Sequence, residues 1–288
     1  MDATKRTPPR HEGPRFTQVL VLPALGIPDR IYTPLLTALN AQPAVRASVL
    51  PLPSIQAGWR GAWRGRRSGY LAWLRSIESD LAARQRLAPE DRYILLGHSI
   101  GGHVGLLALA RQMSRVDGLA LIACGTPHWK AWPRQEGLKM RRGLRVIGAA
   151  LGLLPWYPGD WLGFGGRQPR RLMLDWLSLA RTGRFDGMSG LEHAGADLAS
   201  AIGPVLAIHI EGDSLAPPEA SRALLGLAPG LDIQTVSVRS EMLHKDSGAR
   251  RHNLWPRDPD SVLPTLCRWM QSRAEGPGPI AAGRAAAG

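Results

Sequence analysis

The sequence of 288 residues contains few cysteines and no long apolar run. Its two cysteines, Cys124 and Cys267, lie far apart in apolar segments, which favours buried free thiols in a reducing compartment over a disulfide framework. No apolar run reaches the length of about eighteen residues that a membrane-spanning helix needs. The first residues also lack the apolar segment of a secretory signal. Together, these absences predict a cytoplasmic protein.

Acidic residues are outnumbered, with 23 aspartates and glutamates against 36 lysines and arginines and a formal net charge of +13. Such a charge suits an acidic partner such as nucleic acid or anionic lipid. However, the arginines are scattered and no recognisable nucleic-acid-binding module accompanies them, so we expect a solvated basic surface and no nucleic-acid partner. Histidines and cysteines do not cluster at metal-ligand spacing, so we expect neither a metal nor an organic cofactor.

Apolar, strand-like runs alternate with segments of helical spacing along the chain. Strands are predicted at 17–25, 46–53, 92–97, 118–124, 204–210 and 231–238. Helices are predicted at 29–39, 68–87, 100–113 and 260–272. Continuous apolar strands that alternate with helices predict an α/β fold, in which a mostly parallel sheet is covered by helices on both faces.

The interval 127–200 interrupts this alternation and is too long for a simple loop. It holds five of the ten tryptophans, namely Trp129, Trp132, Trp156, Trp161 and Trp176. We therefore expect an inserted helical cap over the carboxyl edge of the sheet. The α/β core would then comprise 16–126 and 201–273, with a disordered arm at 1–15 and a flexible tail at 274–288.

A glycine-rich turn follows the predicted strand at 92–97. The stretch from Gly97 to Gly101 reads GHSIG, which matches the nucleophile elbow G-x-S-x-G between a strand and a helix. The two glycines leave room where strand and helix approach, and the tight turn holds the hydroxyl of Ser99 above the sheet. The start of the next helix favours developing negative charge. Ser99 is therefore the predicted nucleophile.

A serine nucleophile needs a base, and the base needs an orienting carboxylate that follows the serine and precedes the histidine in this fold. Asp213 is preferred over Glu211, because a carboxylate beyond the end of the strand can point into the crevice. His244 is preferred over His252 as the base, because it lies nearer the end of the last strand. Both alternatives stay open at this point.

Two backbone N–H groups are expected to form an oxyanion hole. One belongs to Ile100, which follows the nucleophile, and the other to Ile27, in the loop after the first strand. The apolar residues of the cap are expected to line or cover the acyl site. Trp156 and Trp161 are the predicted substrate-binding side chains among them.

The motifs GHSIGG and LAPPEA, together with a late histidine, resemble the α/β-hydrolase family. More narrowly, the chain resembles a bacterial group of predicted α/β hydrolases related to the serine aminopeptidase and lysophospholipase-like branch. The narrower resemblance rests on PALGIPDRIYTPLLTAL, LPWYPGDWLGFGGRQPRRLMLDW and LWPRDPDSVLPTLCRWM, and it extends from Val19 to Met270. It implies a serine hydrolase whose base is His244, followed by Trp255. Two departures, LPLPSIQAGWRGAWRGRRSGY and KDSGARR, alter the expected shape of the pocket.

The leading hypothesis is a serine esterase that cleaves an ester, thioester or related acyl bond of a small-molecule substrate through Ser99, Asp213 and His244. The alternatives are an aminopeptidase-like serine peptidase and a non-catalytic, hydrolase-like binding protein. No obligate protein partner is evident. The segment 139–166 joins arginines to an apolar, tryptophan-bearing stretch. Packing as a cap is the preferred interpretation of this segment, and weak peripheral membrane contact is its alternative.

Overall fold

A six-stranded sheet forms the centre of the computed structural model, which describes residues 16–52, 68–112 and 114–273. The strand order is β2-β1-β3-β4-β7-β8, and each neighbouring pair is parallel. The strands are β1 Thr17–Leu22, β2 Val45–Val49, β3 Arg92–His98, β4 Gly118–Ile122, β7 Gly203–Ile210 and β8 Leu231–Val238. The predicted α/β fold with a mostly parallel sheet is thereby confirmed.

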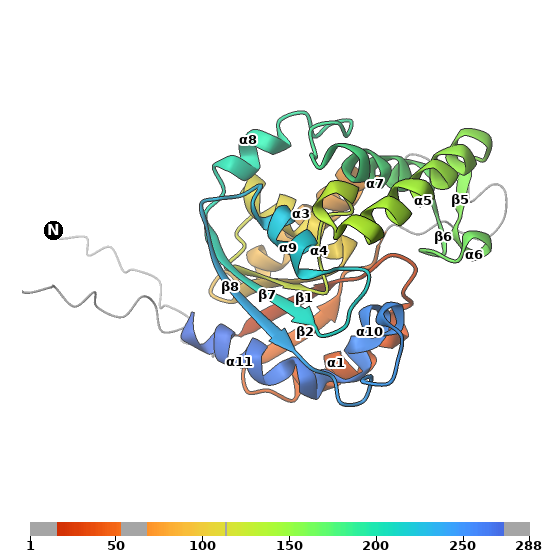
Figure 1. Cartoon of the computed structure of the whole chain (residues 1–288). Coiled ribbons are helices and arrows are strands. Elements are labelled where there is room, and N and C mark those ends of the chain that lie inside the picture. Colours follow the sequence, from red (N-terminus) through yellow and green to blue (C-terminus); the bar gives the residue numbers. More distant parts are fainter. Residues whose placement is uncertain (1–15, 53–67, 113, 274–288) are drawn as a thin grey trace, which may run out of the picture.

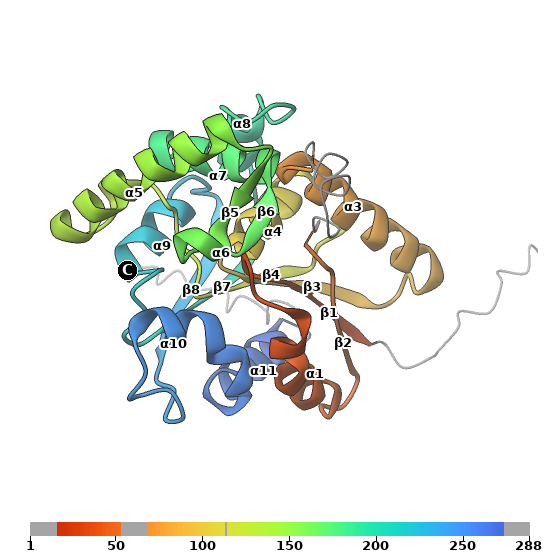
Figure 2. The same cartoon turned by 90° about the vertical axis from the view of Figure 1, so that its right-hand side faces the viewer.

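Helices cover both faces of this sheet (Figures 1 and 2). One face carries α1 Thr33–Asn40, α10 Gly248–Leu254 and α11 Leu263–Ser272, while the other carries α3 Tyr70–Leu87, α4 Ile100–Arg111 and α9 Pro218–Leu225. Short 3₁₀ helices lie at η1 Asp29–Tyr32, η2 Trp129–Ala131, η3 Trp255–Arg257 and η4 Pro259–Ser261. The predicted strand at 17–25 ends earlier, at Leu22, because Pro23 has no N–H to continue the ladder.

The alternation of side chains along β1 gives the molecule two hydrophobic cores. Leu20 and Leu22 face the core under α3 and α4. Val19 and Val21 face the core against α1 and α11. All four side chains are fully buried. Because both faces are covered, the strand reads as a continuous apolar run rather than an alternating one.

The interval between β4 and β7 folds into helices and a small hairpin. Its elements are α5 Arg134–Leu153, β5 Trp156–Pro158, α6 Gly159–Leu162, β6 Arg167–Pro169, α7 Arg170–Thr182 and α8 Ala194–Ala199. These elements lie on the same side of the sheet as α3 and α4 (Figure 2). The antiparallel pair of β5 and β6 was not predicted. Strands of three residues are too short to show a period of two in the sequence.

The outer surface of α5 and α6 exposes large apolar side chains, which belong to Leu138, Val146, Leu153, Trp161 and Leu162. The opposite side of α5 is buried through Leu144, Ile147 and Leu151. None of the described helices is both long enough and apolar enough to cross a membrane. Peripheral contact of this surface with lipid stays a prediction.

Candidate active site

Ser99 forms the sharp turn between β3 and α4. Its backbone has φ 53° and ψ −119°, a conformation that non-glycine residues rarely adopt. The N–H of Ser99 donates to the carbonyl of Ile122 at 3.3 Å, and its carbonyl accepts from the N–H of Gly102 at 2.9 Å. These bonds hold the strained turn from both sides. The serine thus stands in the geometry that the G-x-S-x-G motif predicts.

The flanking glycines are required because backbone approaches them closely. A Cβ on Gly97 would lie 2.3 Å from the Cα of Gly102, in the first turn of α4. A Cβ on Gly101 would lie 2.1 Å from the carbonyl oxygen of Leu22, at the end of β1. Neither neighbour is a flexible side chain that can move away. The spacing of glycines around Ser99 therefore has the steric cause that the sequence suggested.

Asp213 and His252 form a buried acid–base pair. The Nδ1 of His252 lies 2.8 Å from Oδ2 of Asp213, and the two side chains are 5% and 1% exposed. Oδ1 of Asp213 accepts the N–H groups of Leu215 at 2.7 Å and Ala216 at 3.1 Å. Because an ionised carboxylate only accepts, the imidazole donates from Nδ1. In the neutral ring, Nε2 is then left with a lone pair that can take a proton.

His244, the preferred base in the sequence analysis, does not meet Asp213, and His252 takes that place in the structure. The side chain of His244 is exposed, and its Nδ1 faces the carbonyl of Glu241. The loop between β8 and α10 folds through turns, in which the N–H of Asp246 donates to the carbonyl of Leu243 at 2.9 Å, so nearness to the strand end in sequence does not bring His244 to the acid. The helix α10 that follows then carries His252 inward to the acid.

Arg251 holds this loop in place, and sequence reasoning missed its part. Its Nε atom donates to the carbonyls of Leu243 at 3.2 Å and Asp246 at 3.1 Å. Its Nη1 atom donates to the carbonyl of Glu211 at 3.1 Å, and the Glu211 side chain itself is exposed. Of the two acids considered, Asp213 is therefore the one whose carboxylate meets a histidine.

His98 connects this pair to the turn that carries Ser99. The ring centroids of His98 and His252 are 5.3 Å apart, and Nε2 of His98 lies 2.9 Å from the carbonyl oxygen of His252. His98 is the residue directly before Ser99. The structure thus brings the acid–base pair to the turn that carries the serine, at the carboxyl edge of β3.

The two predicted oxyanion donors differ in their surroundings. Ile100 is the first residue of α4, so its N–H has no carbonyl to reach within the helix. The N–H of Ile27 donates to the carbonyl of Ala24 at 3.4 Å, inside its own loop. The N–H of Ala24 donates to the hydroxyl of Tyr32. Among the described residues, the N–H groups of Leu25 and Gly26 have no acceptor.

The insertion directly contacts the predicted oxyanion loop, residues 23–28. Gly26 has φ +71°, and a Cβ there would lie 2.5 Å from the carbonyl carbon of Gly165. A cavity of about 430 Å³ lies where the two segments meet. It is lined by Pro23, Ala24, Gly26, Ile27, Pro28, Asp29, Pro51, Leu52, Asp160, Gly166, Arg167 and Gln168. The lining mixes carboxylates, a guanidinium and an amide with apolar groups.

Neither predicted substrate-binding tryptophan lines this cavity. Trp156, in β5, is half-buried and has the guanidinium of Arg167 5.6 Å from its ring centroid. Trp161, in α6, is 74% exposed. A role of these two side chains in acyl binding stays a prediction.

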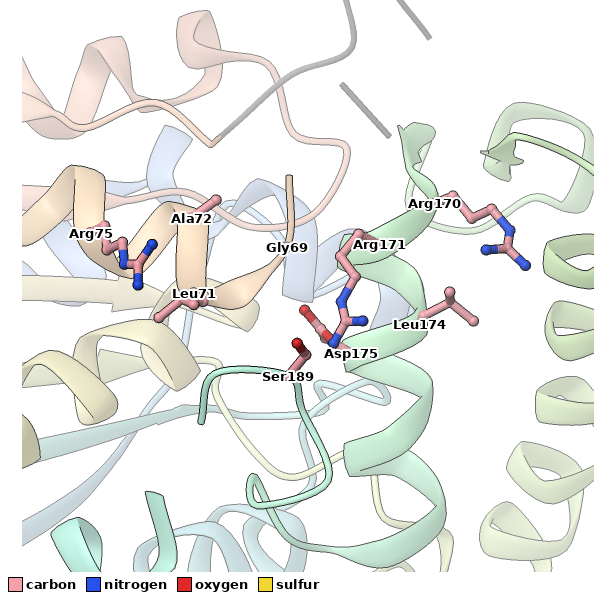
Figure 3. A pocket seen from close by; sticks show the side chains of 9 residues that line it. All are labelled: Gly69, Leu71, Ala72, Arg75, Arg170, Arg171, Leu174, Asp175 and Ser189. Atoms are coloured by element: carbon pink, nitrogen blue, oxygen red, sulfur yellow. The ribbon is translucent and has the colours of Figure 1, made fainter. Parts of the chain in front are cut away.

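A second cavity, of about 530 Å³, opens between the start of α3 and α7 (Figure 3). Arg171 points toward Asp175 there, with 2.6 Å between its Nη2 and Oδ1. The other carboxylate oxygen of Asp175 accepts the N–H of Tyr70 at 3.0 Å. Burial raises the pKa of Asp175. Ser99, Asp213, His252 and the loop after β1 do not line this cavity, and the bond from Tyr70 to Asp175 joins α7 to the start of α3.

Comparison with known proteins identifies the family of this fold. A sequence model of the alpha/beta hydrolase family matches residues 15–275. A putative carbamate hydrolase RutD from Pantoea ananatis (strain LMG 20103) is 24% identical over 217 residues, which cover 71% of this chain and 73% of that protein.

Solved structures of the same fold are similar along most of the chain. Est1E from Butyrivibrio proteoclasticus, solved with ferulic acid bound, matches with a TM-score of 0.56 at 15% identity and 93% coverage of each chain. A monoacylglycerol lipase from Paleococcus ferrophilus matches with a TM-score of 0.53 at 18% identity. The match covers 90% of this chain and 97% of the lipase. At these identities, the likeness establishes the fold alone.

Proposed function

Because the chain belongs to the alpha/beta hydrolase family, we propose that it is a serine hydrolase that cleaves an ester, thioester or related acyl bond. The buried hydrogen bond between Asp213 and His252, beside the strained turn of Ser99, is the observation that carries this proposal. A buried acid–base pair next to a partly exposed serine is the arrangement that activates a hydroxyl for acyl transfer.

In the proposed reaction, Oγ of Ser99 forms a bond to the substrate carbonyl carbon while Nε2 of His252 takes the hydroxyl proton. The tetrahedral intermediate collapses, the bond to the leaving group breaks, and the same proton passes to that group. Water then attacks the acyl-enzyme by the same route and releases the acid. Asp213 keeps the imidazole in the tautomer that accepts at Nε2 and stabilises its charged form.

The oxyanion that develops needs donors placed before the reaction begins. The N–H of Ile100 is one, because α4 leaves it without an intrahelical acceptor. For the second we propose Leu25 or Gly26 in place of Ile27, whose N–H already has an acceptor in its loop. The cavity between this loop and the insertion is then the proposed substrate site.

The proposed substrate carries a polar or charged group, since Asp29, Asp160 and Arg167 line that cavity. A carbamate or amide is the second candidate. It is favoured by the similarity to a putative carbamate hydrolase and by two carboxylates that could hold an ammonium group. The aminopeptidase-like reaction belongs to this second class.

A panel of chromogenic substrates tests the class of bond. It comprises acyl esters of graded chain length with and without a charged end, carbamates, and aminoacyl amides. We expect kcat/KM to be highest for an ester with a polar end, and Arg167→Ala to reduce this preference while leaving acetyl ester turnover nearly unchanged. If no ester is hydrolysed while an amide or a carbamate is hydrolysed rapidly, the enzyme belongs to the second class, the carbamate and amide hydrolases.

The contact between the oxyanion loop and the insertion gives a second expected result. Gly26→Ala should lower kcat/KM by about 10²-fold, because its Cβ displaces the loop that supplies a proposed oxyanion donor. Gly163→Ala is the matched control, since Gly163 also has φ +71° but meets nothing within 4 Å. Both changes carry the same backbone cost of about 1–2 kcal/mol. Steady-state kinetics with equal losses in the two variants would contradict a role of the contact in catalysis.

A further inference from the structure

Two buried side chains connect the three parts of the proposed active site. Tyr32 lies in η1, just after the oxyanion loop, and His98 lies at the end of β3. The N–H of Ala24 donates to the Tyr32 hydroxyl at 2.8 Å, and this hydroxyl lies 2.8 Å from Nδ1 of His98. Nε2 of His98 lies 2.9 Å from the carbonyl oxygen of His252. Tyr32 and His98 are fully buried.

Chemistry fixes the direction of each bond. A backbone N–H can only donate, so the Tyr32 oxygen accepts from Ala24 and its single proton goes to Nδ1 of His98. A carbonyl can only accept, so Nε2 of His98 carries a proton and donates to His252. Burial lowers the pKa of His98 well below its usual range, and a charge on His252 lowers it further. His98 is therefore a neutral ring with both nitrogens in use.

We infer that Tyr32 and His98 are positioning residues that hold the oxyanion loop in register with the catalytic histidine. This inference rests on the proposed function. Without the Tyr32 hydroxyl, Ala24 and Nδ1 of His98 both lose their partner, and the loop and α10 are no longer tied through the residue before Ser99. A displacement of about 1 Å at reacting groups can cost about 10²-fold in rate. The ring of Trp255 packs edge-on against His98 at 5.2 Å between centroids, which limits how the ring can tilt to compensate.

A second tyrosine–histidine unit, in the core on the other face of the sheet, supplies a matched control. The Tyr70 hydroxyl lies 3.0 Å from Nδ1 of His103, and Nε2 of His103 lies 2.9 Å from the carbonyl of Gly125. Tyr70 is fully buried, and burial lowers the pKa of His103 to about 4. This unit ends on the carbonyl of Gly125 and not on that of His252. Gly125 packs against α9. Tyr70→Phe therefore removes a comparable buried bond that is not connected to His252.

The experiment compares the full chain with Tyr32→Phe and Tyr70→Phe. The readouts are kcat and KM for one ester, the rate of labelling by a fluorophosphonate, the free energy of unfolding, and the ¹⁵N imidazole spectrum. We expect Tyr32→Phe to lower kcat and the labelling rate by about 10- to 100-fold with KM changed less. The ¹⁵N signals of both His98 and His252 should shift. Tyr70→Phe should lose stability and keep near-normal rates.

Equal rates in the two variants at equal loss of stability would overturn the positioning role, because the hydroxyl would then serve the fold alone. If the unmodified protein hydrolyses no ester and takes no label, the proposed function fails, and the imidazole spectra decide the connection by themselves. A His252 signal that stays in place in Tyr32→Phe would then overturn it, while a shifted signal would support it.

Discussion

Ser99→Ala is expected to lower kcat/KM by about 10⁴-fold or more and to abolish labelling by a fluorophosphonate. The substitution removes the nucleophilic oxygen and keeps the backbone. Among the described residues, the Ser99 hydroxyl has no hydrogen-bond partner, so its loss leaves no buried group unpaired. The melting temperature of the variant should therefore equal or slightly exceed that of the unmodified protein. Mass spectrometry of the labelled protein, with activity on the best ester of the panel, measures both effects.

Ser200→Ala provides the control, because Ser200 is an exposed serine at the end of α8. It should be labelled and active like the unmodified protein. A Ser99→Ala protein that kept more than about a tenth of its ester hydrolysis would contradict the proposed nucleophile, since the remaining catalysis of a disabled triad is expected to be far smaller.

His252→Ala is expected to lower kcat/KM by about 10⁴-fold, whereas His244→Ala should leave it within about twofold. The reason is the contact with the acid, since His252 meets the Asp213 carboxylate at 2.8 Å and His244 is exposed. Removing a buried partner of a carboxylate also destabilises the fold. His252→Gln keeps the volume of the side chain and should be folded but equally inactive. Kinetics and chemical denaturation of all three variants measure the result.

The reverse order of the two histidines would return the base to His244. Comparable small losses in both variants would instead indicate that no histidine of this region takes the serine proton. In that case the buried pair of Asp213 and His252 would have a structural role only.

Patterns that are local in the chain were sufficient for the central sheet and the nucleophile turn. All six predicted strands are present. The four central strands, β1, β3, β4 and β7, are largely buried, and a strand buried on both faces is apolar along most of its length. The glycines around Ser99 could also be interpreted from the sequence, because the cause is steric and acts at fixed positions. The close approach of β3, α4 and β1 excludes a Cβ at fixed positions in the sequence. Asp213, preferred as the acid from its place beyond β7, does meet a histidine, while its catalytic role stays a prediction.

The tertiary structure alone decided which groups meet across long separations. His252 rather than His244 reaches Asp213 because Arg251 fastens the loop after β8 to the loop after β7. The N–H of Ile27 donates to the carbonyl of Ala24 inside its own turn, and this bond depends on the exact path of that loop. The chain of bonds from Ala24 through Tyr32 and His98 joins segments that share no local pattern. Periodicity records which face of an element is buried, whereas a hydrogen bond depends on the direction of one side chain, and that direction is set by packing.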